Sequence, residues 1–342
     1  MFVERPKVTT AVTDPPALVA DPVAVPVVCA GVVVADHLST PISHVPAPGE
    51  LVPADDLILN IGGCATNAAV VLAKLGVRSR VCGRVGDDAF GRFIADTLRE
   101  HGVETSGLKV DPIRATSQSL VINVQGQDRR FIHSFGANHG FEASDLDLTF
   151  DPTAPVPKVL YLGGFFILPG LDPDDLAERF GRARARGTMT LLDVVTPGPG
   201  DYLDAIRRVL PHVDVFLPNT DEATLILGDP DPVRQALAFR DMGARRIVVT
   251  RGDQGAIVVS ESLRVRVGTY SVPYVDGTGG GDAFDSGYIA GLVDGLSELD
   301  CLHLASALGA SCVRSVGTTA GTFDRPQADA FILARDLPID PI

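Results

Sequence analysis

Residues 25–35 read VPVVCAGVVVA, a continuous apolar run that is rich in valine. This composition is typical of a strand buried on both faces of a parallel sheet, because neither face needs polar side chains. Segments with helical spacing then alternate with strand-like segments along the chain. The alternation predicts an α/β fold with a doubly wound, mainly parallel sheet flanked by helices. The expected helices are residues 64–76, 87–102, 173–187, 201–212 and 221–228, and the further strands are residues 78–86, 158–164, 188–195, 213–219 and 244–252.

Two segments interrupt this alternation. Residues 38–60 and 116–135 lack helical spacing, and the second predicts a hairpin that turns at residues 126–128. They follow the first strand and the second helical unit, so we expect a small antiparallel sheet that projects from the main one. Such a sheet would act as a lid over a site, and the alternative is an edge extension with no function.

The composition limits the classes of function. The 342 residues carry a formal charge of −14 and only four lysines, which argues against a nucleic-acid surface, since phosphate backbones are bound by clustered Lys and Arg. No apolar run approaches the roughly 18 residues that span a membrane. Residues 1–26 contain acids and prolines where a signal peptide has a basic start, so we expect a loose extension. The five cysteines lack metal-ligand spacing, which favours a cytoplasmic protein.

Residues 276–287, DGTGGGDAFDSG, place three glycines and Asp282 directly before a helical pattern. Unpaired N–H groups at a helix start bind a phosphate well where no side chain blocks the approach. The alternative is a glycine-rich turn in which Asp282 is only a favourable first-turn acid. Neither common nucleotide-binding fingerprint is present, because no lysine precedes Ser or Thr and no G-x-G-x-x-G follows a strand.

Three other stretches accompany this one. Residues 62–69, GGCATNAA, place two glycines and Asn67 at another helix start. Residues 219–223, NTDEA, place Asn219 and Glu222 three positions apart, a spacing that also fits a capping box. Residues 250–256, TRGDQGA, predict a glycine-punctuated turn between strands.

Taken together and in this order, these motifs resemble those of the ribokinase-like, or PfkB, family of carbohydrate kinases. GGCATNAA is similar to the family's N-terminal signature, and DGTGGGDAFDSG to its C-terminal D-T-x-G-A-G-D signature. The resemblance covers roughly residues 27–335 and implies a kinase domain over residues 27–340. This chain departs from the pattern at Gly277, where Thr is frequent, and at Gly280, where Ala is usual.

The resemblance implies a role for each matching residue. Asp282 would be the base that takes the proton of the attacking hydroxyl, and the backbone of Gly279, Gly280, Gly281 and Asp282 would be the anion hole. Glu222 would organise Mg²⁺ through water. A monovalent cation such as K⁺ would adjoin Asp276 and Thr278. Nucleotide contacts would come from Asn219, Thr250, Gly252, Gly255 and Thr278, with residues 307–317 beside the adenine.

The acceptor side is implied in the same way. Asp36 at the end of the first strand would accept hydrogen bonds from substrate hydroxyls, with further contacts from Gly62, Gly63 and Asn67, and from Asn138, which is equally plausible as a turn residue. Residues 38–60 contain no Phe, Tyr or Trp to stack on a base, which favours a sugar. The alternatives are an adenosine-like nucleoside kinase and a catalytically silent sugar-binding regulator. We expect MgATP and a sugar as ligands and a homodimer as the assembly.

Overall fold

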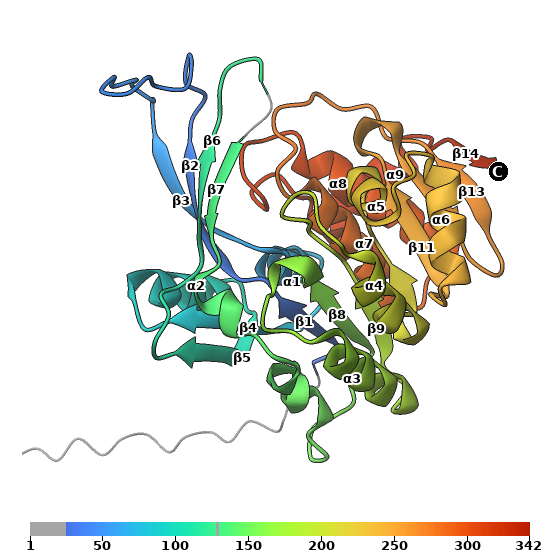
Figure 1. The fold of residues 1–342 in the computed structure, drawn as a ribbon. Helices are drawn as coiled ribbons and strands as arrows, with labels where there is room; N and C mark the ends of the chain where they lie inside the picture. The colour runs from blue at the N-terminus through green and yellow to red at the C-terminus, as the bar shows by residue number, and fades with distance from the viewer. Residues whose placement is uncertain (1–24, 128–129) are drawn as a thin grey trace, which may run out of the picture.

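The computed structural model describes residues 25–127 and 130–342, so most of the expected N-terminal extension lies outside the described residues. Helices pack on both faces of a central sheet, and a small second sheet stands apart from it (Figure 1). This is the predicted α/β architecture. The central sheet has the strand order β14-β13-β12-β11-β10-β9-β8-β1-β4-β5. Its strands are β1 (Val27–Gly31), β4 (Ser79–Gly86), β5 (Glu104–Asp111), β8 (Val159–Gly163), β9 (Met189–Leu192), β10 (Val215–Phe216), β11 (Arg246–Thr250), β12 (Ala256–Val259), β13 (Arg264–Val267) and β14 (Ile339–Pro341).

The pairings from β11 to β5 are parallel, whereas β12, β13 and β14 extend the sheet in antiparallel fashion. The antiparallel edge is not among the elements that the sequence predicts. Carboxyl ends of neighbouring parallel strands meet at one edge of a sheet, which is where ligands bind in this architecture. We therefore expect a binding site at the carboxyl ends of the parallel strands.

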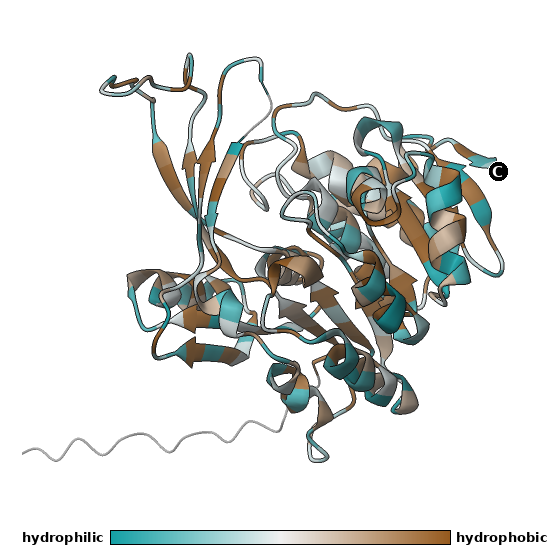
Figure 2. Cartoon of the chain, in the orientation of Figure 1, coloured by the Kyte–Doolittle hydropathy of each residue, from teal (hydrophilic) through white to brown (hydrophobic). Residues whose placement is uncertain are grey.

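Two hydrophobic cores lie on the two faces of the sheet. Strand β1 contributes Val27 and Cys29 to one core and Val28 and Ala30 to the other, which explains its unbroken apolar sequence. Helices α1, α2, α7, α8 and α9 cover the first core, and helices α3 to α6 cover the second. Figure 2 shows hydrophobic strands at the centre and both hydrophilic and hydrophobic residues on helices such as α3 and α4. The helices are α1 (Cys64–Lys74), α2 (Ala89–Glu100), α3 (Pro173–Ala185), α4 (Leu203–Val209), α5 (Thr220–Leu227), α6 (Pro232–Asp241), α7 (Gly280–Asp294), α8 (Glu298–Cys312) and α9 (Arg325–Leu333), with short 3₁₀ turns η1 (Gly136–Gly140), η2 (Ala143–Phe150), η3 (Phe165–Ile167), η4 (Leu210–His212) and η5 (Gly252–Gln254).

The apolar run at residues 25–35 is not one strand, and this corrects the sequence-based expectation. It divides into β1, which ends at Gly31, and β2 (Val34–Ser39), which belongs to the small sheet. Gly31 has a φ of +118°, and a Cβ there would lie 2.2 Å from the carbonyl oxygen of Gly163. Because the chain leaves the central sheet at this glycine, Asp36 lies within β2 and not at the end of the first strand.

The small sheet has the order β3-β2-β6-β7, with β3 (Leu57–Gly62), β6 (Gln118–Ile122) and β7 (Arg130–Ser134). Strands β2 and β3 pair antiparallel, as do β6 and β7, which agrees with the predicted hairpin. The central pair, β2 and β6, is parallel. The sheet rises beside the carboxyl ends of the central strands (Figure 1), and we refer to it below as the small sheet. None of the described helices is long and apolar enough to cross a membrane.

Candidate functional site

The glycine-rich stretch forms the start of α7. Gly279 is the N-cap residue and has a left-handed φ of 77°, and a Cβ at this position would lie 2.6 Å from the carbonyl oxygen of Thr318. A Cβ at Gly281 would meet nothing within 4 Å, so the backbone there is open to an approaching group. A Cβ at Gly280 would lie 3.4 Å from Val313, so the alanine usual in the family would also fit. The helix start thus offers its N–H groups to a cavity.

Asp282 in the first turn of α7 faces the start of α1. The side-chain amide of Asn67 donates from Nδ2 to Oδ2 of Asp282 over 2.8 Å. Gly63, the N-cap residue of α1, has a φ of 91°, and a Cβ there would lie 2.4 Å from the carbonyl oxygen of Val32. The two glycine-rich motifs therefore meet at Asp282, although they are far apart in sequence.

Asp36 of the small sheet joins the same region. Its side chain is 8% exposed, and a Cβ at Gly62 would lie 1.8 Å from Oδ2 of Asp36, so only glycine leaves room for the carboxylate. Burial raises the pKa of Asp36 to about 6, with a hydrogen bond from Ser119 acting against the shift and the charge of Asp282 adding to it. The predicted acceptor residues Asp36, Gly62, Gly63 and Asn67 are thus brought together.

Asn138 has a different environment. It is fully buried, its Oδ1 accepts from the backbone N–H of Val33, and its Nδ2 donates to the carbonyl oxygen of Val33. These bonds fix the crossing between β1 and β2. The geometry favours the structural alternative that the sequence left open, and a contact with substrate stays a prediction.

Sequence reasoning missed two carboxylates near Asp282. Asp193 follows β9 and accepts from the backbone N–H of Gly164 at 3.2 Å, and Asp285 is buried in α7 and accepts from the Tyr161 hydroxyl at 3.2 Å. Burial, together with neighbouring carboxylates, raises the pKa values of both well above the usual range. Asp193 could have been found from its position at the carboxyl end of a parallel strand. Asp285 carries no such signal, because it lies in the middle of an apolar helix.

Glu222 lies at the start of α5 and forms hydrogen bonds with Asn219. Its Oε2 accepts from the backbone N–H of Asn219 at 2.9 Å, and Oδ1 of Asn219 accepts from the N–H of Glu222 at 2.8 Å. This is the capping box, so the cap that the sequence suggested is present. Burial raises the pKa of Glu222 to about 8. The side chain also lines a cavity of about 730 Å³ with Asp193, Asp282 and Asp285, so capping does not withdraw it from the site.

This group of carboxylates fits a hard divalent cation. Mg²⁺ prefers oxygen ligands and usually takes one or two carboxylates while keeping several waters. Burial and, to a lesser extent, neighbouring carboxylates raise the pKa values of Asp193, Asp285 and Glu222, and a cation between them would offset both effects. The donor set therefore matches Mg²⁺, with Asp193 and Glu222 as the residues that would hold it.

A second cavity of about 730 Å³ adjoins the start of α7. Three predicted nucleotide residues, Thr250, Gly252 and Gly255, line it. Thr250 also lines the first cavity, which contains Asn219 and Glu222. The lining of the second cavity also includes Gly309 and Val313, which are within the stretch expected beside the adenine. Further lining residues were not predicted from the sequence, among them Tyr270, Val272, Tyr274 and Phe284. A pocket with apolar walls that ends in glycine N–H groups suits a nucleotide.

Asp276 and Thr278 organise the loop before α7. Oδ1 of Asp276 accepts from the backbone N–H and the hydroxyl of Thr278, at 3.0 and 2.7 Å, and Oδ2 accepts from the N–H of Gly317 at 3.1 Å. These bonds join the loop to the segment after α8. A monovalent cation beside them stays a prediction.

Residues 27–324 match the pfkB family of carbohydrate kinases. The chain belongs to this family. Among curated proteins it is 27% identical over 282 residues to the ATP-dependent 6-phosphofructokinase of Thermoanaerobacterium thermosaccharolyticum, covering 81% of this chain and 85% of that one. It is 28% identical over 304 residues to the ribokinase of Arabidopsis thaliana, covering 83% and 75%.

Solved structures agree with this assignment to the pfkB family. An E. coli protein assigned as ribokinase II and solved with ATP and Mg²⁺ superimposes with a TM-score of 0.74 at 25% identity, covering 90% of this chain and 99% of that one. The Arabidopsis ribokinase in complex with ribose and ATP gives a TM-score of 0.75 at 24% identity, with the same coverage. The pfkB fold of this chain is therefore established.

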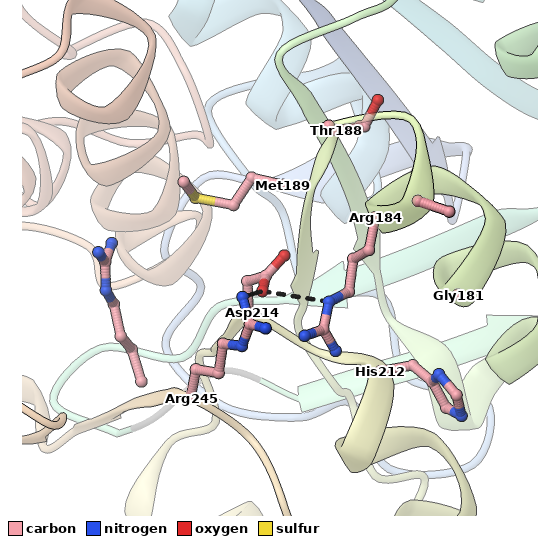
Figure 3. Close-up of a pocket in the computed structure, with 10 residues that line it drawn as sticks. Gly181, Arg184, Thr188, Met189, His212, Asp214 and Arg245 are labelled. Carbon is pink, nitrogen blue, oxygen red and sulfur yellow. Dashed lines mark hydrogen bonds and ion pairs between the residues drawn. The ribbon is translucent and has the colours of Figure 1, made fainter.

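A further cavity of this pfkB-family chain, of about 700 Å³, lies at the opposite edge of the sheet, at the amino-terminal ends of β9, β10 and β11 (Figure 3). Asp214 lies between Arg184 and Arg245 there, with N–O distances of 3.4 and 3.1 Å. Because one carboxylate pairs with both guanidinium groups, this arrangement holds α3 and two strand ends together. It contains none of the predicted site residues.

Proposed function

We propose that this protein transfers the γ-phosphoryl group of ATP to a hydroxyl group of a sugar. The observation that carries the proposal is the position of Asp282. It lies where the start of α7, the cavities on the nucleotide side and the acceptor residues Asn67 and Asp36 meet. A single carboxylate between a phosphate-binding helix start and a hydroxyl-binding aspartate suits phosphoryl transfer.

The proposed step follows from this arrangement. Asp36 and Asn67 orient the acceptor so that one hydroxyl faces Asp282 and the start of α7. The hydroxyl oxygen forms a bond to the γ-phosphorus, the bond from that phosphorus to the ADP oxygen breaks, and the hydroxyl proton passes to Asp282. The N–H groups at Gly279 to Asp282 stabilise the charge on the transferring group. Asp193 and Glu222 would hold Mg²⁺, which when bound would neutralise phosphate charge.

The acceptor class is narrowed by the chemistry around Asp36. A carboxylate accepts hydrogen bonds from hydroxyls but repels a phosphate or a carboxylate placed beside it. We therefore place neutral hydroxyls of the acceptor at Asp36 and Asn67. Names among the relatives, which include fructokinases, ribokinases, a 6-phosphofructokinase and a 2-dehydro-3-deoxygluconokinase, define the compounds to be tested.

A screen for ADP release in MgATP tests the proposal. The panel contains pentoses, hexoses, fructose 6-phosphate, keto-deoxy sugar acids and nucleosides, and mass spectrometry identifies the phosphorylated product. We expect acceptor-dependent ADP release with one of the sugars, and its loss in Asp282→Asn. Release with nucleosides alone would make the protein a nucleoside kinase. Sugar binding by calorimetry without any ADP release would make it a regulator.

We also propose that the small sheet closes over the acceptor as a lid, and that it joins two copies of the chain in a homodimer. Support comes from the position of Asp36 in β2 and from the exposed apolar side chains Leu57, Leu59, Leu120 and Ile132 on β3, β6 and β7 (Figure 2). Two of these strands, β3 and β7, are edges that offer unpaired backbone groups.

A further inference from the structure

Cys64 lies directly beside Asp282 and Asp193. The three residues come from the start of α1, the start of α7 and the segment after β9, and their Sγ and carboxylate oxygen atoms all lie within 4.8 Å of one another. Cys64 is 8% exposed, yet all three residues line the cavity of about 730 Å³ that contains Glu222. The proposed phosphoryl transfer makes no use of this thiol.

One sulfur and two carboxylate oxygens form a ligand set for a thiophilic divalent cation. Zn²⁺ binds thiolate at about 2.3 Å and carboxylate oxygen at about 2.0–2.2 Å in tetrahedral geometry, which places ligand atoms about 3.6 Å apart. The three atoms lie within 4.8 Å of one another, so they would have to move closer together to bind the ion. Mg²⁺ takes oxygen ligands and gains nothing from the sulfur. The thiol therefore favours binding of Zn²⁺ over Mg²⁺ at these three residues.

The surroundings favour a cation at this point. Among the described residues, no salt bridge joins Asp193 or Asp282 to Arg or Lys, and the carboxyl groups of Asp285 and Glu222 line the same cavity. The amide of Asn67 is 3% exposed and donates to Asp282, and its Oδ1 is buried without a hydrogen-bond partner. This buried, unpaired oxygen belongs to the residue that contacts Asp282, and it is a second indication that a ligand binds beside the cluster.

We propose that Cys64, Asp193 and Asp282 form a binding site for Zn²⁺ or another thiophilic divalent cation, and that occupation of this site inhibits phosphoryl transfer. The inhibition rests on the proposed function, because it requires Asp282 to accept the hydroxyl proton. On binding, the S–H bond of Cys64 breaks, its proton passes to solvent and a sulfur–metal bond forms, while the carboxylates donate oxygen lone pairs. No electron is transferred. The side chain at position 64 thus sets how well the enzyme tolerates zinc.

Binding can be measured without any activity. Cadmium titrated into the full-length protein produces an ultraviolet thiolate-to-metal charge-transfer band, and we expect one Cd²⁺ per chain. Cys64→Ser keeps the size and a hydrogen-bonding hydroxyl but removes the sulfur, so the band should disappear. Cys301→Ala is the matched control, since Cys301 is another fully buried cysteine, in α8 and outside the site, and should leave the band unchanged.

Calorimetry with Zn²⁺ and melting curves on the same variants complete the test. We expect Cys64→Ser to weaken zinc binding at least tenfold and to raise by a similar factor the zinc concentration that halves activity, each variant being compared with its own zinc-free rate. If Cys64→Ser unfolds, Asp193→Asn with Cys64 intact replaces it and should weaken the band. A band that persists in Cys64→Ser overturns the site, and bound zinc without inhibition overturns the regulatory part. A chain that phosphorylates no acceptor but shows the Cys64-dependent band refutes the proposed function and leaves the metal site standing.

Discussion

Asn67 donates to Asp282 over 2.8 Å and thereby joins the starts of α1 and α7, which lie 215 positions apart in the sequence. The bond directs the carboxylate away from its own helix and toward the acceptor residues. Asp282 is therefore not acting as a side-chain cap of α7. This relationship allows the role of Asp282 in catalysis to be separated from a role in stability.

Asp282→Asn should lower kcat by about 10² to 10⁴, the range for a positioned acid or base, with little change in sugar affinity. Burial raises the pKa of Asp282, so a neutral side chain removes a buried charge and should leave the melting temperature unchanged or raise it. Phosphate transfer and thermal unfolding measured on one preparation check both expectations. A variant that retains substantial turnover and melts earlier would support the first-turn acid alternative.

Asn67→Ala should shift the acid limb of the kcat profile to higher pH. The amide of Asn67 favours the charged form of Asp282, so its removal raises the pKa of the carboxyl further. Asn67→Asp should shift the limb further in the same direction, because a like charge then lies beside Asp282. The measurement is kcat against pH for the three proteins. An unchanged acid limb in both variants would show that Asn67 does not tune Asp282.

Glu222→Gln should weaken the apparent Mg²⁺ affinity of turnover by about 10 to 100-fold while sugar binding stays the same. Gln also completes a capping box, so α5 should remain capped by Asn219 and the melting temperature should change little. Glu222→Ala is the comparison that removes both roles. Steady-state rates across a Mg²⁺ titration decide the matter, and identical titration curves for wild type and Glu222→Gln would leave Glu222 as a helix cap.

Acceptor binding should weaken below about pH 6 because Asp36 then becomes protonated. Burial raises the pKa of Asp36 from 3.8 to about 6, with the charge of Asp282 adding to the shift and Ser119 and His37 opposing it. Below this value the side chain loses acceptor capacity for sugar hydroxyls. We expect the acceptor KM, but not the ATP KM, to rise on acidification, and Asp36→Asn to remove this dependence.

The same shift has a consequence for stability. Between about pH 4 and about pH 6 the folded protein binds a proton at Asp36 that the unfolded chain has released, so the free energy of unfolding should fall as pH rises through this window. The contribution is on the order of 3 kcal/mol. Urea unfolding of wild type and Asp36→Asn at pH 4 and pH 7 measures it. Parallel changes in the two proteins would assign the pH dependence to other groups.

The homodimer can be tested at the small sheet. Leu59, Leu120 and Ile132 are 37%, 43% and 63% exposed, and β-strand register places them on one face. Leu120→Lys combined with Ile132→Lys should convert a dimer to a monomer in light scattering, whereas Leu333→Lys on α9, at 89% exposure, should not. A wild-type monomer at micromolar concentration would refute the dimer.

Much of the fold was predictable because local sequence patterns determine where most strands and helices form. Alternating apolar runs and helical spacing predict β1, β4, β8, β9 and β11 and the helices between them. The strands are buried on both faces, and helices such as α2 and α3 are buried on one. The glycines at 279–281 and the N-x-x-E spacing at 219–222 predict helix starts, and these signals are also local. Both depend only on neighbouring residues.

The tertiary structure decided what no local pattern contains. The backbone of Gly31 packs against Gly163 of β8, which neighbours β1 in the sheet but is far from it in the sequence. The chain leaves the central sheet at this glycine, and Asp36 therefore lies in the small sheet. Asp193 becomes part of the site only because a separate element brings it to Asp282. Asp285 lies one turn after Asp282 in α7, but only packing against other elements buries it, and burial raises the pKa values of all three. Sequence alone determined which residues carry suitable chemistry. Their distances, burial and charges depend on the packing of segments far apart in the chain, and these only the folded structure determines.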